Sequence, residues 1–150
     1  MHPDFKELLA EFNVHHVEYL VVGAHALAAH GHVRATKDMD IWVRPNPANA
    51  KRVVAALEAF GAALHGATDL DLSGPDFVLQ LGVAPIRIDV ITSITGVTFD
   101  EAWPDRLQTV FDGEPVGVLS KRHLIRNKSA TGRLQDIADV EWLRRVGPED

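Results

Sequence analysis

Apolar residues recur along this chain in two periods, one typical of helices and the other typical of strands. Residues Pro3–Phe12 carry their apolar side chains at helical spacing, which predicts a first helix there. Further helices are predicted over Ala24–His30, Ala48–Phe60, Thr98–Leu107, Lys121–Thr131 and Arg133–Arg145, with Ser120 as a capping residue and Gly132 as a break. In the helices over residues 48–60 and 133–145, the residues expected to face the protein core are Val53, Val54, Leu57, Phe60, Ile137, Val140 and Leu143.

Short apolar runs between these helices predict strands. They cover Glu18–Val22, Asp38–Val43, Phe77–Leu81, Ile86–Ile91, Val110–Phe111 and Val116–Leu119. The turns at residues 82–85 and at Asp112-Gly113 predict two hairpins, while the polar stretch Gly66–Gly74 is expected to be a loop. Strands mixed with helices, and paired in hairpins, predict one α/β or α+β domain over residues 1–150, built on a mixed sheet with flanking helices.

Composition narrows the class of protein. The chain has 150 residues, of which 46% are hydrophobic and 24% charged, as in ordinary globular proteins. No apolar run is long enough to span a bilayer and no signal peptide is recognisable, so a cytoplasmic protein without membrane contact is expected. The absence of cysteine excludes disulfides, thiolate metal sites and thiol nucleophiles.

The net charge of −6 argues against general binding to polyanions. The charge is uneven, because the chain from Lys121 onward carries seven basic residues against five acidic ones. Two interpretations stay open: a basic face that meets phosphates, or a helix surface with ion pairs one turn apart.

The pair Asp38 and Asp40 is the strongest chemical signal. Alternate residues of a strand share a face, so these two carboxylates point to one side while Met39, Ile41 and Val43 point to the other. Like charges so close resist joint ionisation unless a cation lies between them. A solvated edge strand is the alternative, but aspartate is depleted in strands, and we expect a divalent ion, most plausibly Mg²⁺.

Asp89 is a third carboxylate on a predicted strand. On its own it has two interpretations: a salt bridge with Arg87 on the same face, or a place beside Asp38 and Asp40 if the two strands are neighbours. Three carboxylates with two Mg²⁺ ions suit the transfer of a phosphoryl or nucleotidyl group.

The order of these motifs along the chain resembles that of the nucleotidyltransferase superfamily with the DNA polymerase beta-like fold. That pattern is a strand, a glycine turn (Gly23-Ala24), a helix, an Asp-x-Asp motif at residues 38–40 and a later carboxylate at Asp89. Residues 30–40 and 127–139 are similar to AbiEii-type abortive-infection nucleotidyltransferase toxins and related prokaryotic proteins, and the likeness extends from about Tyr19 to Leu143.

The resemblance implies roles for individual residues, which stay expectations here. Asp38, Asp40 and Asp89 would bind the metal ions, and Asp89 would also help to deprotonate the acceptor. The residues implied in nucleotide binding are Gly23, Ala24, His25, Thr36 and Lys128. Ala24 departs from the usual glycine or serine, which removes a possible hydrogen bond to phosphate.

The resulting prediction is a magnesium-dependent enzyme that moves a nucleoside monophosphate from an NTP to a hydroxyl of RNA or protein. A toxin with an antitoxin partner is one form of it. A catalytically degenerate module that binds nucleotide or a partner is the alternative, since position 24 is alanine. A histidine-based zinc hydrolase is a third hypothesis, although His25 and His30 lie five residues apart and so do not share a helix face.

Overall fold

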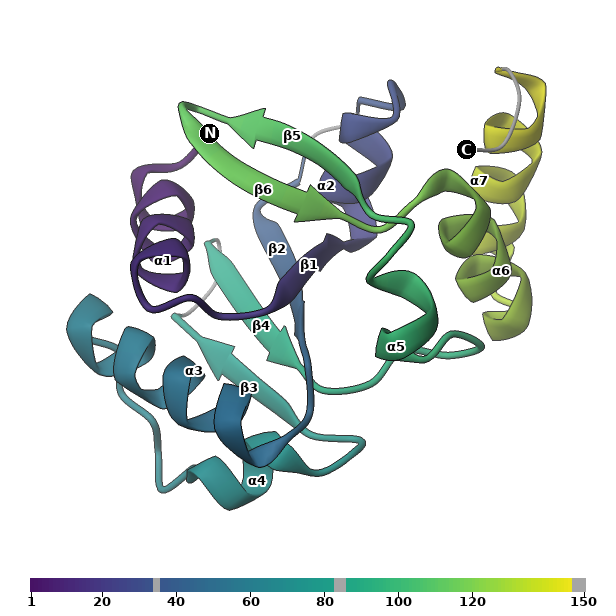
Figure 1. The fold of residues 1–150 in the computed structure, drawn as a ribbon. Helices are drawn as coiled ribbons and strands as arrows, with labels where there is room; N and C mark the ends of the chain where they lie inside the picture. Colours follow the sequence, from purple (N-terminus) through teal and green to yellow (C-terminus); the bar gives the residue numbers. More distant parts are fainter. Residues whose placement is uncertain (34–35, 83–85, 147–150) are drawn as a thin grey trace.

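The computed structural model describes residues 1–33, 36–82 and 86–146, in which a six-stranded mixed sheet has helices on both faces (Figure 1). The strands are β1 (Tyr19–Val22), β2 (Asp38–Val43), β3 (Val78–Leu81), β4 (Arg87–Ile91), β5 (Leu107–Phe111) and β6 (Glu114–Val118). The helices are α1 (Pro3–Val14), α2 (Gly23–Ala29), α3 (Pro47–Phe60), α4 (Asp69–Ser73), α5 (Phe99–Ala102), α6 (Lys121–Thr131) and α7 (Leu134–Arg145). The mixed α+β architecture predicted from the sequence is confirmed.

The strand order β3-β4-β2-β1-β6-β5 brings several strand ends to one end of the sheet. Strands β2 and β4 are parallel and both begin there, while β1 is antiparallel to β2 and ends there. Strand β6 is parallel to β1 and also ends there, so the chain enters α6 at this end. Residues far apart in sequence are thereby gathered at one edge.

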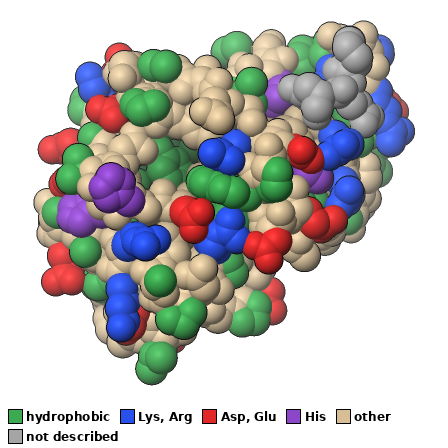
Figure 2. Space-filling model, in the orientation of Figure 1, with side chains coloured by type: hydrophobic (Ala, Val, Ile, Leu, Met, Phe, Trp, Pro, Cys, Tyr) green, Lys and Arg blue, Asp and Glu red, His purple; other side chains and the backbone are tan. Residues whose placement is uncertain are grey.

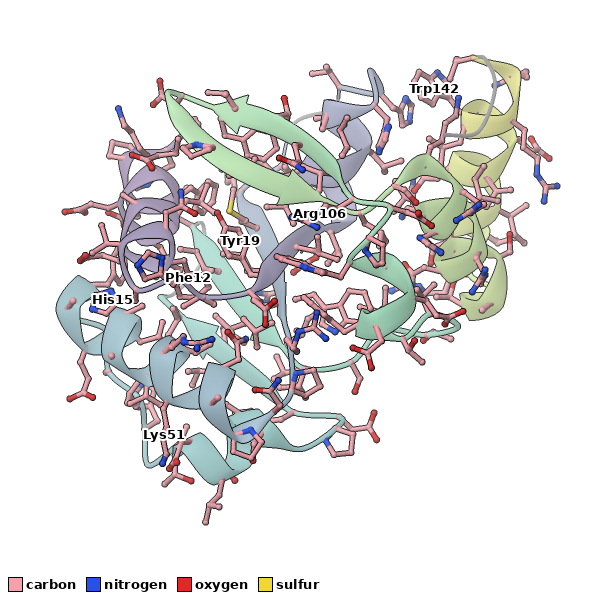
Figure 3. The ribbon with its side chains drawn as sticks, in the orientation of Figure 1. Phe12, His15, Tyr19, Lys51, Arg106 and Trp142 are labelled. Atoms are coloured by element: carbon pink, nitrogen blue, oxygen red, sulfur yellow. The ribbon has the colours of Figure 1, made fainter. Side chains whose placement is uncertain are left out.

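One face of the central strands is apolar and the other carries charge. On β2 the side chains of Met39, Ile41 and Val43 are fully buried. Tyr19 lies opposite Val43 in the β1–β2 register and packs edge-on against Phe12 of α1, so α1 covers this apolar face (Figure 3). Helices α1 and α3 pack together, and α6 and α7 pair on the opposite side of the molecule (Figure 1).

The other face of β2 carries Asp38, Asp40 and then Trp42. Trp42 is buried and packs edge-on against Phe99 of α5, with ring centroids 5.0 Å apart. Short helix α5 therefore closes this face at one end of β2. The two aspartates at the start of the strand lie beyond that aromatic cover and are only partly buried.

Two of the local predictions were wrong. The stretch Gly66–Gly74 is not a loop throughout, because α4 forms within it, stabilised by a capping box between Thr68 and Asp71. The helix predicted over Thr98–Leu107 is only the single turn α5, and Leu107 already begins β5. The next turns from Trp103 are not helical, and the Arg106 guanidinium instead stacks over the Trp103 ring, 3.8 Å from its centroid.

The predicted hairpins and helix ends are largely correct. Strands β3 and β4 pair antiparallel, as do β5 and β6, although residues 83–85 of the first turn lie outside the described part of the chain. The Ser120 side chain caps α6 and Gly132 ends it with a φ of 71°. Ile137 was expected to pack inward but is 44% exposed, whereas Val140 and Leu143 of the same helix are buried.

None of the helices in the described ranges is long and apolar enough to cross a bilayer. On the face of the molecule that Figure 2 displays, acidic and basic side chains are interspersed rather than gathered into one large patch of a single sign.

Candidate active site

The parallel register of β2 and β4 brings the three predicted carboxylates together. Asp40 lies directly opposite Asp89, and Asp38 lies directly opposite Arg87. Register partners on parallel strands point to the same face, so these four side chains form two adjacent rows. Asp89 therefore lies beside Asp38 and Asp40, because its strand β4 is the neighbour of β2.

The Arg87 guanidinium lies between two of the carboxylates. Its Nη2 atom is 3.3 Å from Oδ2 of Asp38 and 3.4 Å from Oδ2 of Asp89. The salt bridge that the sequence offered as the alternative for Asp89 is thus present together with the carboxylate cluster. Its extension to Asp38 was missed, because it depends on the strand register and not on any local pattern.

Asp40 is the most perturbed of the three carboxyl groups. Burial and then the charges of Asp89 and Asp38 raise its pKa to about 6, although Arg87 and Lys128 act in the opposite direction. Burial also raises the pKa of Asp89, against the lowering effect of Arg87. The cluster thus carries more negative charge than the protein itself compensates.

Gly23 is required where α2 approaches Asp40. It has a φ of 68°, and a Cβ atom at this position would lie 2.5 Å from Oδ2 of Asp40. A side chain would therefore push directly against the carboxylate as well as strain the backbone. Ala24 follows in the first turn of α2, next to the acidic cluster.

Thr36 and His25 support the start of β2. The Thr36 hydroxyl donates to the backbone carbonyl of Asp38 at 3.1 Å and accepts from its N–H at 3.2 Å. The His25 ring lies near the Asp38 backbone and packs edge-on against Phe5, and its buried Nδ1 atom has no hydrogen-bond partner among the described residues. Burial lowers the pKa of His25, so at neutral pH it is an uncharged hydrogen-bonding group.

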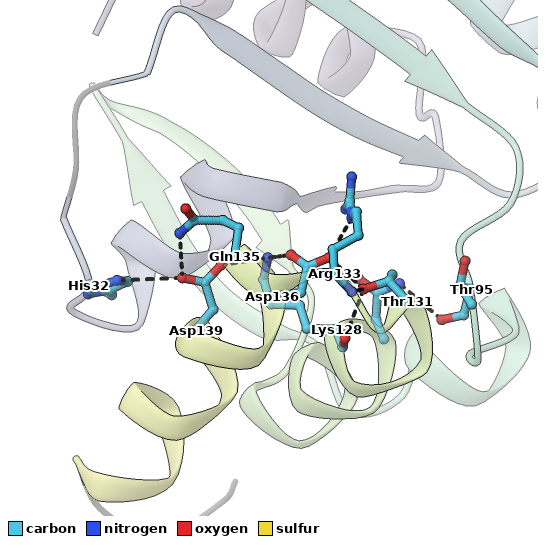
Figure 4. A network of polar contacts seen from close by, with 9 residues as sticks. His32, Thr95, Lys128, Thr131, Arg133, Gln135, Asp136 and Asp139 are labelled. Atoms are coloured by element: carbon cyan, nitrogen blue, oxygen red, sulfur yellow. Dashed lines mark hydrogen bonds and ion pairs between the residues drawn. The ribbon is translucent and has the colours of Figure 1, made fainter.

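Lys128 is held by two acids of α7 (Figure 4). Its Nζ atom lies 3.1 Å from Oδ1 of Asp136 and 3.0 Å from Oδ2 of Asp139, and its side chain is only 9% exposed. Burial raises the pKa of Asp136, but hydrogen bonds from Thr131, Lys128 and Arg133 outweigh it, and the net shift is downward. Lys128 is therefore fixed in position, and its charge still acts on Asp40.

The histidines proposed for a zinc site, other than His25, contact groups outside the cluster of Asp38, Asp40 and Asp89. His30 shares a hydrogen bond of 2.9 Å with the Leu119 carbonyl, and His32 lies 3.7 Å from Asp139 and stacks on Trp142. Across residues 1–33, 36–82 and 86–146, no three His, Asp or Glu side chains already form a ready-made metal cage.

The acidic cluster nevertheless fits a divalent ion by its chemistry. Its donors are the carboxylate oxygens that hard ions such as Mg²⁺ prefer. Oδ1 of Asp89 is buried and has no hydrogen-bond partner within the described structure. A bound cation would satisfy that oxygen and lower the repulsion that raises the pKa of Asp40.

Sequence comparison assigns the chain to a family. The profile of the family described as "Nucleotidyltransferase of unknown function (DUF6036)" matches residues 4–144. The chain belongs to this nucleotidyltransferase family. No curated protein matches the sequence.

Solved nucleotidyltransferase structures share the fold. The lincosamide adenylyltransferase LnuA, solved with lincomycin bound, superimposes with a TM-score of 0.64 at 15% identity, over 98% of this chain and 98% of LnuA. ANT(2'')-Ia in complex with adenylyl-2''-tobramycin gives a TM-score of 0.60 at 12% identity, over 93% and 84% of the two chains. An antigenic nucleotidyltransferase-like protein from Paracoccidioides brasiliensis gives 0.50 at 13% identity, over 91% and 71%. At these identities the likeness establishes the nucleotidyltransferase fold.

Proposed function

We propose that this nucleotidyltransferase transfers a nucleoside monophosphate from a magnesium-bound NTP to an acceptor hydroxyl at the acidic cluster. The observation that carries the proposal is the gathering of Asp38, Asp40 and Asp89 on one face, where Asp40 has a pKa of about 6. A functional site is the usual place for such uncompensated charge.

Each residue has a proposed part in the reaction. Asp38, Asp40 and Asp89 would hold Mg²⁺, which when bound neutralises charge on the triphosphate and on the departing pyrophosphate. Gly23, Ala24 and His25 would lie along the phosphates, with Thr36 fixing the backbone of Asp38.

The chemistry is a substitution at the α-phosphorus. The bond from the acceptor oxygen to the α-phosphorus forms while the bond to the bridging oxygen breaks, and pyrophosphate leaves with that electron pair. Asp89 is the proposed acceptor of the hydroxyl proton, because it lies directly opposite Asp40 and burial raises the pKa of its carboxyl group. Lys128, clasped by Asp136 and Asp139, would supply fixed positive charge to the phosphates.

RNA or a protein is the first proposed class of acceptor. The sequence likeness to AbiEii-type toxins supports it, whereas Arg122, Arg126, Lys128 and Arg133 are paired with acids and add no support. A toxin of that kind would act with an antitoxin as its partner. Expression of the wild type should then arrest growth, and expression of Asp40→Asn should not.

A small molecule is the second class of acceptor, and one feature of the structure favours it. A pocket of about 430 Å³ lies between α2 and the β5–β6 turn, lined mainly by apolar side chains together with His25 and Asp112. His25 lines this pocket and also lies near the Asp38 backbone, whereas the three carboxylates themselves do not line it. The fold neighbour LnuA was solved with the small molecule lincomycin bound.

Transfer of label tests the proposal directly. The protein is incubated with each α-³²P-labelled NTP, Mg²⁺ and separate fractions of cellular RNA, protein and small molecules. We expect one fraction to become labelled, and we expect Asp38→Asn and Asp40→Asn to lower the rate at least about a hundredfold, because metal-bound charge is lost.

Asp76→Asn is the matched control for these variants. Asp76 is exposed in the loop before β3, and asparagine tolerates its positive φ of 58°. Its activity should equal that of the wild type. Calorimetry with NTP and Mg²⁺ separates an enzyme from a degenerate binding module: binding without label in any fraction would favour the module, with Ala24 as its cause.

A further inference from the structure

Arg87 occupies the position between the carboxylates that a divalent ion would take. Its guanidinium contacts Asp38 and Asp89 at 3.3 and 3.4 Å, and its charge acts on Asp40. It projects from β4 two residues before Asp89 and directly opposite Asp38 in the register. A single side chain thus contacts two members of the cluster and acts on the third through its charge.

The ion pairs around Arg87 are incompletely satisfied. The Nε atom of Arg87 and the Oδ1 atom of Asp89 are both buried, and neither has a hydrogen-bond partner in the described structure. The pairs are themselves only partly buried, so these two unpaired atoms are a local cost that a purely structural ion pair normally avoids. This contrasts with Asp136, which receives hydrogen bonds from Thr131, Lys128 and Arg133.

The guanidinium neutralises only part of the negative charge of the three carboxylates. Three carboxylates and one guanidinium give −3 + 1 = −2 when all are ionised, so a net negative charge remains on the cluster. A divalent ion would balance this charge, but the guanidinium fills space at the oxygens that the ion needs. Arg87 is 38% exposed, so its side chain has room to turn toward solvent or toward a phosphate.

From these contacts we infer that Arg87 is a built-in counter-cation, which holds Asp38 and Asp89 in the free protein and has to leave them before the divalent ion binds. This inference rests on the metal site of the proposed function. It makes the ion alone a weak ligand. It also makes the metal–NTP complex a better one, because the triphosphate offers the displaced guanidinium a new anionic partner.

Binding of Mn²⁺ without any acceptor tests this role without relying on activity. Free Mn²⁺ is measured by electron paramagnetic resonance as the protein is titrated, with the wild type, Arg87→Met and Arg87→Lys. We expect Arg87→Met to bind Mn²⁺ about tenfold more tightly than the wild type, because the competing cation is gone. Arg87→Lys should lie between them, since one ammonium group spans the two carboxylates less well than a guanidinium.

Arg126→Met is the matched control. Arg126 lies on α6, is 45% exposed and pairs with Glu101 at 2.8 Å, so this variant loses a comparable ion pair away from the cluster. Its affinity for Mn²⁺ should equal that of the wild type. Addition of ATP should raise the Mn²⁺ affinity of the wild type more than that of Arg87→Met.

The outcomes separate this inference from the proposed function. If Arg87→Met and Arg87→Lys bind Mn²⁺ no better than the wild type, Arg87 is a structural clamp and the inference is overturned, even where Asp38→Asn still abolishes label transfer. If the wild type transfers no label and binds no Mn²⁺ with ATP, the proposed function fails as well. Should Arg87→Met not fold, the Arg87→Lys titration and the ATP effect in the wild type decide the matter.

Discussion

At the scale of one residue, the ionised side chain of Asp40 lowers the free energy of unfolding. A carboxyl whose pKa rises from 3.8 to about 6 on folding binds its proton more tightly in the folded state than in the unfolded state. Its charged form therefore destabilises the fold. The cost is fully present above about pH 6 and disappears below about pH 4, where both states are protonated.

Asp40→Asn should consequently stabilise the protein when no divalent ion is present. At about pH 7.5 the free energy of unfolding should rise by on the order of 1–2 kcal/mol, since a neutral amide removes the repulsion from Asp38 and Asp89. At about pH 4 the gain should vanish. Urea denaturation at a series of pH values, with EDTA present, measures both.

Addition of Mg²⁺ is the internal control for this prediction. Mg²⁺ together with ATP should stabilise the wild type and have little effect on Asp40→Asn, whereas Mg²⁺ alone should have a smaller effect on the wild type. A variant that is less stable than the wild type at neutral pH would show that Asp40 is held by favourable contacts rather than by repulsion.

At the scale of elements, the pairing of α6 with α7 depends on one buried lysine. Lys128 on α6 contacts Asp136 and Asp139 on α7, and all three side chains are almost completely buried (Figure 4). Removing one partner from a buried ion pair leaves the other charges uncompensated. The clasp therefore fixes α7 as well as the lysine.

Lys128→Met should lower the free energy of unfolding by about 3 kcal/mol or more, since Asp139 would lose its ion pair with Lys128 and Asp136 would keep only Arg133 as a cationic partner. Arg126→Met, on the same helix α6 but in an exposed pair with Glu101, should cost much less. Chemical denaturation of both variants gives the comparison. Equal small losses would mean that the clasp contributes no stability of its own.

The sequence predicted those elements whose pattern is local. The apolar stripe of α1, the Asp-x-Asp strand β2 and the cap of α6 at Ser120 all follow from neighbouring residues. Helix α4 was missed because its polar, turn-like residues conceal the Thr68–Asp71 capping box. The helix predicted at α5 was too long, because Leu107 pairs with Val118 of β6 and belongs to a strand.

The acids of the site, Lys128 and the Arg87–Asp89 pair were predictable, but the further contacts of these two cations were not. Asp38, Asp40 and Asp89 are visible as charged residues among hydrophobic ones. The bridge from Arg87 to Asp38 depends on the register between β2 and β4, which no short stretch of sequence determines. The burial of Lys128 likewise depends on how α7 folds back against α6.

At the scale of the whole molecule, topology assembles the site. The acids come from the starts of β2 and β4, the glycine turn follows the end of β1, and Lys128 is carried by the helix that follows β6. All four strands meet at one end of the sheet. Helices α1 and α3 cover the opposite, apolar face, which leaves the acidic face open to substrates.

The position of a bound ion tests this account most directly. A crystal of the protein grown with Mn²⁺ and a non-hydrolysable NTP analogue would show the ion by anomalous scattering. The account predicts Mn²⁺ within about 2.5 Å of carboxylate oxygens of Asp38, Asp40 and Asp89, with the Arg87 guanidinium moved away. An ion bound elsewhere, or a nucleotide bound while Arg87 still bridges Asp38 and Asp89, would contradict it.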